Sequence, residues 1–211
     1  MICGVDEAGK GAVLGPLVVA AVGCRALVEL EALPVRDSKA LSPRQRERLA
    51  AAIGERCAVR TIAIDAAGID AARQRTGLNE YMAEVHARAL AGLRPKSAYI
   101  DACDVDPVRY GRRVGGHLDF PCLIRSEHRA DETYKIVGAA SIVAKVCRDR
   151  IIADLREEYG EIGSGYPSDP ATIRFLREYI EAHRTPPACA RRSWKTVANL
   201  LCRQTGLLDF Q

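Results

Sequence analysis

Short apolar runs alternate along the chain with longer segments that repeat apolar residues at helical spacing. Residues 1–5 and 17–24 are apolar, rich in β-branched residues and too short for helices, so we expect two strands joined by a glycine-rich turn. Residues 57–65 predict a third strand. The stretch SAYID at 97–101 predicts a short strand that ends on an acid.

Two helices are predicted from the way they begin. Ser42 precedes Pro43, and Gln45 follows two residues later, which is the pattern of a capping box with proline at the first helical position. Asp169 before Pro170 is a second start of the same kind.

Two further helices are predicted from their period. Residues 78–93 repeat apolar side chains at helical spacing, and residues 131–159 do so over a single long helix. The buried stripe of the long helix consists of Ala140, Val143, Ala144, Cys147, Ile151 and Leu155. Strands joined first by a tight turn and later by helices predict an α/β fold, a mixed sheet flanked by helices with a helical C-terminal portion.

The composition is that of a globular chain of 211 residues, 48% of them apolar, with no stretch near the roughly 18 to 20 apolar residues that span a bilayer. Because no basic leader with an apolar core opens the sequence, a cytoplasmic location is expected. The eight cysteines include no C-x-x-C pair, so reduced thiols in the core are favoured over a zinc knuckle or disulfides.

The net charge of +4 does not identify a nucleic-acid partner, but the charges are unevenly distributed. A stretch near the C-terminus holds basic residues and no acid: Arg184, Arg191, Arg192, Lys195 and Arg203. A basic flank beside an acidic centre suits metal ions that hold a polyanion, and a solvated basic face is the alternative. Lys39, and Lys145 with Arg148 on the predicted long helix, are candidates to contact phosphate or to assist the scissile group, and a solvated face is again the alternative.

Acids lie at the ends of three predicted elements. Asp6 and Glu7 end the first strand, Asp101 ends a later strand, and Asp131 lies at the start of the long helix. Because strand ends and helix starts meet in one crevice of an α/β sheet, the four carboxylates are expected to converge and to need cations. Oxygen ligands favour Mg²⁺ or Mn²⁺, and two such ions support phosphodiester hydrolysis. For each acid alone, a helix cap or a solvated turn is the alternative.

Gly9 and Gly11, on either side of Lys10, have two interpretations. They permit positive φ in a tight turn, or they let backbone N–H groups approach a ligand closely. Neither G-x-x-x-x-G-K-[ST] nor G-x-G-x-x-G is present, so the stretch is weak support for an ATP site.

Six blocks carry a resemblance to a known family: DEAGKGAVLGP, RDSKALSPRQRERL, YIDACDV, HRADETYKIVGAASIVAKVCRDR, GSGYPSDP and RRSWKT. Together, from residue 2 to about 200, they resemble ribonuclease HII of the archaeal type. The resemblance implies a ribonuclease H-like catalytic domain over 1–200. It also implies metal-dependent cleavage of the RNA strand of RNA–DNA hybrids, including single ribonucleotides in duplex DNA. The implied catalytic and metal-binding carboxylates are Asp6, Glu7, Asp101 and Asp131, with Mg²⁺ or Mn²⁺ as cofactor.

The resemblance also implies contacts with the substrate. Gly9, Lys10 and Gly11 correspond to the family's Gly-Arg-Gly loop, which reads the ribose 2′-OH largely through backbone groups. Lys10 stands where Arg is usual, which puts phosphate contacts of this side chain in question. Tyr166 resembles the tyrosine that packs on the deoxyribose after the ribonucleotide, and a tyrosine buried in a glycine-rich loop is the alternative.

Two other functions are alternatives to ribonuclease HII: ribonuclease HIII and a non-catalytic module that binds hybrids. Ribonuclease HIII normally carries an extra N-terminal domain, whereas this sequence begins at the first catalytic strand. A non-catalytic module that binds hybrids has no need for four convergent acids. A monomeric enzyme of DNA repair and replication is therefore the expectation.

Residues 204–211, QTGLLDFQ, follow the region that resembles the catalytic domain. Gln204, Leu207 and Phe210 have the Q-x-x-L-x-x-[FY] order of peptides that dock onto sliding clamps. Gln211 replaces the second aromatic usual there, so a modest affinity is expected. A C-terminal turn that packs on its own domain is the alternative.

Overall fold

In the computed structural model the chain forms two compact units, and the structure describes residues 1–35 and 41–208, the last six of these by their backbone alone. The sheet unit consists of Met1–Ala8, Val18–Ile62 and Gly77–Cys147. The helical unit consists of Gly9–Leu17, Ala63–Thr76 and Arg148–Gln211. Among the described residues, no helix is long and apolar enough to cross a membrane.

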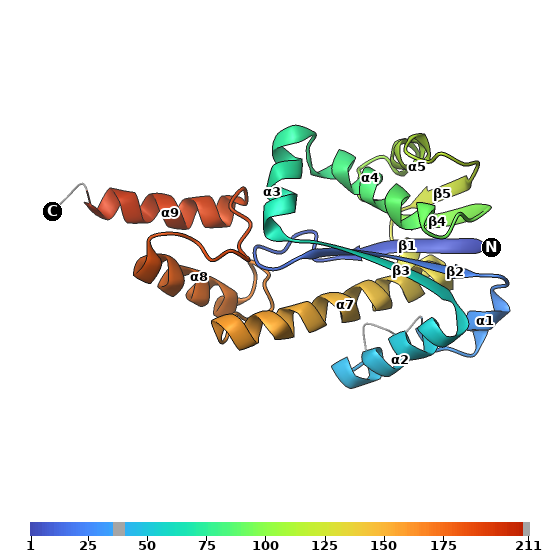
Figure 1. Ribbon diagram of the computed structural model, residues 1–211, viewed down its shortest axis with the longest axis horizontal. Coiled ribbons are helices and arrows are strands. Elements are labelled where there is room, and N and C mark those ends of the chain that lie inside the picture. The colour runs from blue at the N-terminus through green and yellow to red at the C-terminus, as the bar shows by residue number, and fades with distance from the viewer. Residues whose placement is uncertain (36–40, 209–211) are drawn as a thin grey trace. The chain divides into compact units, whose positions relative to one another are not determined.

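The sheet unit is built on a five-stranded sheet of order β3-β2-β1-β4-β5 (Figure 1). β1 (Ile2–Ala8) pairs antiparallel with β2 (Leu17–Cys24) and parallel with β4 (Ser97–Asp101). β4 also pairs parallel with β5 (Leu123–Glu127), and β3 (Ala58–Ile64) lies at the opposite edge. The mixed sheet confirms the predicted fold class.

The pairing of β1 with β2 corrects one predicted boundary. The ladder continues past Asp6 to Glu7, opposite Val19, and to Ala8, opposite Val18. Asp6 and Glu7 therefore lie within the strand rather than at its end. All eight residues of β2 are buried, which explains its unbroken apolar sequence, since a central strand covered on both faces has no polar side.

Helices cover both faces of the sheet (Figure 1). They are α1 (Val28–Glu31), α2 (Pro43–Arg56), α4 (Leu78–Ala91), α5 (Pro107–Gly116), α6 (Ala130–Thr133) and the first part of α7 (Lys135–Tyr159). α4 packs against β1 and α5 against β5. On the other face, α7 passes so close to β1 that a Cβ at Gly4 would lie 2.2 Å from the Ile136 carbonyl oxygen, so only glycine fits there.

The prediction of one helix over 131–159 is wrong at its start. α6 ends at Thr133, Tyr134 has extended backbone angles, and α7 begins only at Lys135. Tertiary contacts explain the break, because the Tyr134 ring packs on Tyr99 with centroids 4.5 Å apart and its hydroxyl donates to Glu127. Asp131 therefore lies in a short helix of its own.

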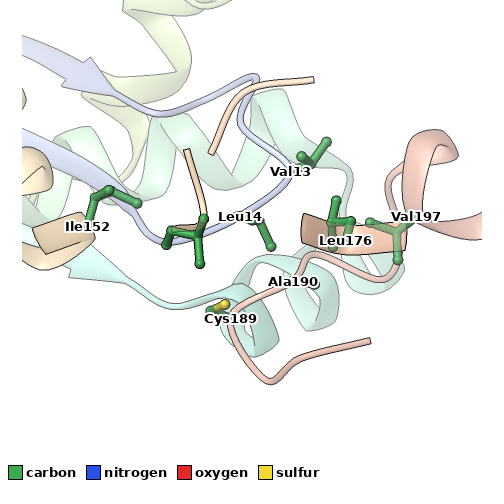
Figure 2. Packing of buried hydrophobic residues seen from close by; sticks show 8 residues of the cluster. Val13, Leu14, Ile152, Leu176, Cys189, Ala190 and Val197 are labelled. Carbon is green, nitrogen blue, oxygen red and sulfur yellow. The ribbon is translucent and has the colours of Figure 1, made fainter. Parts of the chain in front are cut away.

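The helical unit surrounds a second apolar core (Figure 2). Its helices are α3 (Ala66–Arg75), the rest of α7, α8 (Pro170–His183) and α9 (Lys195–Leu208). The buried cluster consists of Val13, Leu14, Ile152, Ile162, Leu176, Cys189, Ala190 and Val197. Asp169 caps α8 as predicted, since its carboxylate accepts from the Ala171 N–H, and Pro170 occupies the first helical position.

Candidate active site

The sheet brings the predicted carboxylates to one of its ends. Val5 of β1 pairs with Ile100 of β4, and Asp6 and Asp101 follow these residues directly on the two neighbouring parallel strands. Asp131 lies in the first turn of α6, where the N–H of the preceding residue donates to Asp101 Oδ1 at 2.8 Å. Elements far apart in sequence thus assemble one acidic cluster.

The acids in this cluster repel one another. Asp6 is only 5% exposed. Burial and the charge of Glu7 raise the pKa of Asp6 well above its ordinary value, although a hydrogen bond from Ser141 acts in the opposite sense. Burial also raises the pKa of Asp101, and so do the charges of Glu7 and Asp131. The ionised forms are therefore disfavoured unless a cation joins them.

Glu7 has neighbours that the sequence analysis did not identify. The Cys103 thiol donates to Glu7 Oε1 at 3.1 Å, and His86 Nε2 lies 3.4 Å from Glu7 Oε2. His86 is fully buried, and its Nδ1 lies 3.1 Å from the Tyr110 hydroxyl. One signal in the sequence pointed to His86, since it lies on the apolar face of the helical repeat, four residues after Met82.

The donor set fits a hard divalent cation. Four carboxylates offer only oxygen, which suits Mg²⁺ or Mn²⁺, and a cation offsets the repulsion that raises the pKa of Asp6 and Asp101. Glu7, His86 and Cys103 also hold one ligand atom each within 4.8 Å of one another. That mixed set surrounds the same Glu7 and suits softer ions.

In the helical unit, Gly9 and Gly11 play different roles. Gly9 has a φ of +86°, and a Cβ there would lie 2.4 Å from Arg148 Nε. The Ala12 N–H donates to the Gly9 carbonyl at 3.2 Å, which closes a tight turn around Lys10 and Gly11. Gly11 is exposed, has no positive φ, and a Cβ there would meet no atom within 4 Å. The turn therefore requires Gly9, whereas Gly11 leaves its backbone accessible.

Arg148 supports the loop formed by residues 9–16 through hydrogen bonds to its backbone. It is 1% exposed and donates to the carbonyl oxygens of Leu14, Pro16 and Ser164 at 3.2 to 3.3 Å. Its guanidinium lies over the Tyr166 ring, 4.7 Å from the centroid. The predicted interpretations of Arg148, a phosphate contact or a solvated face, are both wrong, because the buried guanidinium donates its hydrogen bonds to backbone carbonyls.

Arg191 belongs to the same support. It is fully buried and donates to the carbonyl oxygen of Gly15 at 3.1 and 3.2 Å and to that of Lys10 at 3.0 Å. Burial and the charge of Arg148 lower the pKa of Arg191 to about 10, so it stays charged at neutral pH. Within the predicted basic stretch, Arg191 is therefore an internal support rather than part of a surface.

The loop that carries Tyr166 is joined to the Gly9–Gly15 segment. The N–H groups of Val13 and Leu14 both donate to the Gly165 carbonyl, at 2.8 and 3.0 Å. Gly165 has a φ of +81°, and a Cβ there would lie 2.7 Å from the Leu14 carbonyl oxygen. Tyr166 itself is half-buried, so one side of its ring rests on Arg148 while the side chain keeps access to solvent.

The remaining predicted site residues are less fully described. Lys39 and Phe210 lie outside the described residues. Gln204 and Leu207 lie on the backbone of α9, and their side chains are not described. Lys145 lies half-buried on α7.

Comparison with known proteins gives a consistent result. The sequence matches the Ribonuclease HII family over residues 3–197. A ribonuclease HII of Methanoregula boonei is 57% identical over 205 residues, covering 97% of this chain and 96% of the relative. A chain of the solved PCNA:RNase HII complex from Archaeoglobus fulgidus has a TM-score of 0.88 and 44% identity, with 95% and 96% coverage. Ribonuclease H2 from Pyrococcus horikoshii OT3 has a TM-score of 0.90 and 39% identity, with 96% and 97% coverage.

The fold and these likenesses first define a class, the α/β nucleases with a ribonuclease H-like fold. Within this class, the chain belongs to the ribonuclease HII family, of the archaeal type, as its sequence blocks predicted. It is therefore a ribonuclease H, an enzyme that cleaves RNA strands paired with DNA.

Proposed function

We propose that the protein is an endonuclease that hydrolyses the RNA strand of hybrids and cuts at ribonucleotides embedded in duplex DNA, by a two-metal-ion mechanism. The observation that carries the proposal is the cluster of Asp6, Glu7, Asp101 and Asp131, whose mutual repulsion calls for cations. Mg²⁺ or Mn²⁺ is the proposed cofactor. When bound, such ions supply an activated water and the charge that stabilises the leaving 3′ oxygen, giving 5′-phosphate and 3′-hydroxyl ends.

The side chains of the acidic cluster are proposed to hold the cations and to orient the attacking water. Asp6, Glu7, Asp101 and Asp131 would hold the cations, and the Cys103 thiol, which donates to Glu7, fixes the orientation of that carboxylate. Asp131, in the first turn of α6, orients the attacking water. Burial of Asp6 keeps bulk water from competing for its carboxylate.

Recognition of the ribonucleotide is assigned to the helical unit. Gly11 leaves open space at its Cα, so a ribose 2′-OH can approach the backbone of Gly9–Lys10–Gly11. Arg191 holds the Lys10 carbonyl, which keeps this turn in one conformation. Tyr166, backed by Arg148, offers a ring face to the following deoxyribose. Lys39 is proposed as a phosphate contact, and the catalytic domain is proposed to span 1–200, including parts of both units.

Cleavage of matched substrates tests this function. Three end-labelled duplexes of one sequence are compared in Mg²⁺ and in Mn²⁺: all DNA, DNA with a single ribonucleotide, and an RNA–DNA hybrid. We expect cleavage of the second and third only, with ends that a DNA ligase accepts as 5′-phosphate and 3′-hydroxyl. Cutting of the all-DNA duplex, or cutting that persists when a chelator is present, would contradict the proposal.

A sliding clamp is the proposed protein partner. The Archaeoglobus fulgidus relative, 44% identical, was solved as a complex with PCNA. Gln204, Leu207 and Phe210 are the residues proposed to dock, and a tether to DNA suits a monomeric, cytoplasmic enzyme of replication and repair because it raises local concentration. Binding of the full chain to the clamp, measured by calorimetry, tests the partnership.

A further inference from the structure

Cys24, Glu29 and Cys57 form a second cluster of ligand groups in the sheet unit. Cys24 ends β2 opposite Ile2, at the far end of β1 from Asp6. Glu29 lies in α1, and Cys57 lies between α2 and β3. One ligand atom from each of the three residues lies within 4.8 Å of the other two. The cluster is therefore separate from the acidic end of the sheet.

The two thiols are in unusually close contact. Their Sγ atoms are 2.7 Å apart, although the residues are 33 positions apart in sequence. A disulfide is much shorter, at about 2.05 Å. Both cysteines are buried, 1% and 7% exposed, and both are free thiols. Two buried thiols and a carboxylate with ligand atoms within 4.8 Å of one another have the donor types of a thiolate-rich cation site. Binding one tetrahedral ion would move the two Sγ atoms apart to about 3.8 Å, because each Zn–S bond is about 2.3 Å long.

The surroundings fit such a site electrostatically. Burial raises the pKa of both Cys24 and Cys57, and the charge of Glu29 acts in the same sense. The Glu29 carboxylate is held toward the loop by the Ala26 N–H, which donates to its Oε1 at 3.3 Å. Glu29 is only half-buried, so the cluster has a route to solvent. A cation reaching the cluster would meet the Glu29 carboxylate and two thiols whose ionised forms burial disfavours.

We propose that Cys24, Glu29 and Cys57 bind a thiophilic divalent cation such as Zn²⁺. Thiolates select zinc over the hard Mg²⁺ and Mn²⁺ proposed for the carboxylate cluster. Three protein ligands leave a fourth position of the tetrahedron for water. On binding, the two thiols release their protons to solvent, and two Zn–S bonds and one Zn–O bond form.

The consequence is structural. A bound ion would join the end of β2, helix α1 and the residue before β3, which adds a cross-link to two neighbouring strands of the sheet. Because the ion binds the folded chain, it stabilises the sheet unit by mass action. The proposed site would stabilise the sheet and would take no part in cleavage.

Cobalt gives a direct optical test on the full chain. The reduced, metal-free protein is titrated with Co²⁺ in excess Mg²⁺, which occupies the carboxylate cluster. We expect a thiolate-to-cobalt charge-transfer band that saturates at one equivalent and is displaced by Zn²⁺. Cys24→Ala and Cys57→Ala should each abolish the band, and Glu29→Gln should weaken Co²⁺ binding by about tenfold or more. Zn²⁺ should raise the thermal midpoint of the wild type but not of the cysteine variants.

Two further Cys→Ala variants test whether the cobalt band arises from Cys24 and Cys57 or from other thiols. Cys103→Ala removes the thiol beside Glu7, and Cys189→Ala removes a buried free thiol of the helical unit. Both variants should keep the band. Absence of any band, its loss in Cys103→Ala, or its survival in the Cys24 and Cys57 variants overturns the proposal. So does a purified protein whose mass lacks the two thiol hydrogens under reductant, since that is a disulfide.

If a Cys→Ala variant fails to fold, Cys57→Ser keeps the volume of the side chain and removes the soft ligand. Glu29→Gln changes a half-exposed group and is expected to fold. Unchanged Co²⁺ affinity in both would also overturn the assignment.

Discussion

Asp6 in the sheet unit and Arg148 in the helical unit are both nearly buried charged residues, 5% and 1% exposed. Each has a neighbour of its own sign, Glu7 for the acid and Arg191 for the arginine. The difference lies in their other partners. Arg148 donates to three backbone carbonyls, whereas the charges around Asp6 are further carboxylates.

The comparison separates two uses of buried charge. The arginines have found their partners within the protein, so their charge holds a loop in shape. The carboxylates also accept hydrogen bonds, but the charges that raise the pKa of Asp6 and Asp101 are other carboxylates, whose repulsion a cation would offset. Burial of a charged group is therefore not enough to identify a catalytic residue, because the sign and kind of its neighbours decide the role.

Neutralising one member of the acidic cluster should have the largest effect on activity. Asp101→Asn keeps the size of the side chain and removes a ligand charge, so cleavage in Mg²⁺ should fall by roughly a hundredfold or more. The repulsion from Glu7 and Asp131 also disappears, so the metal-free variant should be at least as stable as the wild type. Cleavage rates and thermal midpoints in a chelator check both; near wild-type cleavage would contradict the metal site.

The pH dependence of the metal-free wild type is the control. Asp6 and Asp101 have a raised pKa in the folded chain, so the native state holds protons more tightly than the unfolded chain. The free energy of unfolding should then fall as pH rises from about 4 through the raised pKa, and saturating Mg²⁺ should reduce this fall. Stability that rises with pH over this range would show that the acids do not repel.

Substitution of Arg148 should lower the free energy of unfolding, whereas Asp101→Asn should not. Arg148→Lys keeps the charge but cannot reach the carbonyls of Leu14, Pro16 and Ser164 together, so unfolding free energy should fall by roughly 2 to 4 kcal/mol. Arg150→Lys, on the exposed side of α7, is the matched control and should be neutral. Denaturant unfolding measures both. Equal stability of the two variants would mean that the carbonyl contacts contribute little.

Local signals in the sequence predicted the elements that depend on local physics. The caps at Ser42 and Asp169 gave the starts of α2 and α8, and the strand at 97–101 has the predicted bounds. Helices α3 and α5 and strand β5 were not predicted, although Asp106 before Pro107 is the same kind of helix start as at α8. The sequence LIRSE of β5 has little apolar pattern, and its place is set by pairing with β4. The break at Tyr134 likewise depends on packing against Tyr99.

The candidate site divides in the same way. The convergence of the carboxylates was predictable because acids near the ends of strands and at the start of a helix meet at one end of a sheet, although Asp6 and Glu7 lie inside β1; their role as metal ligands stays a prediction. The roles of Arg148 and Arg191 were not, since whether an arginine faces solvent or carbonyls depends on which loop folds over it. His86 was missed for a similar reason, because its partners Glu7 and Tyr110 come from other elements.

Removing the ring above Arg148 tests whether the helical unit reads the substrate or only supports itself. Tyr166→Ala should slow cleavage at a lone ribonucleotide by roughly tenfold to thirtyfold, since one stacking contact is lost. Cleavage of a long hybrid should slow less, because it offers many positions. Initial rates on both substrates give the ratio. An equal loss on both would indicate a structural role for the ring.

Gly11→Ala separates recognition from folding within the same turn. A Cβ at Gly11 meets no atom within 4 Å, so the stability should not change. If a ribose approaches this backbone, the methyl group displaces it, and cleavage should fall by about five- to tenfold. Gly54→Ala, at an equally open position on α2, is the control; its cleavage should not change, and its stability should rise by about 0.5 to 1 kcal/mol because alanine favours the helix. Unchanged activity of Gly11→Ala would remove Gly11 from the substrate contacts.

Removal of the C-terminal tail, residues 204–211, should have the smallest effect on cleavage, because the tail belongs neither to the acidic cluster nor to the buried arginines. A chain ending at Arg203 keeps Val197, Leu200 and Leu201, the α9 residues in or against the apolar cluster, so it should fold and cut naked duplex at the full rate. Its affinity for the cognate clamp should be lost, and Phe210→Ala should lose it as well, because docking peptides bury their aromatic in an apolar pocket. Calorimetry with the clamp and cleavage without it measure the two properties separately. Binding by the shortened chain as tight as by the full chain would exclude the tail as a tether. Slower cleavage of naked duplex would show instead that the tail supports the catalytic domain.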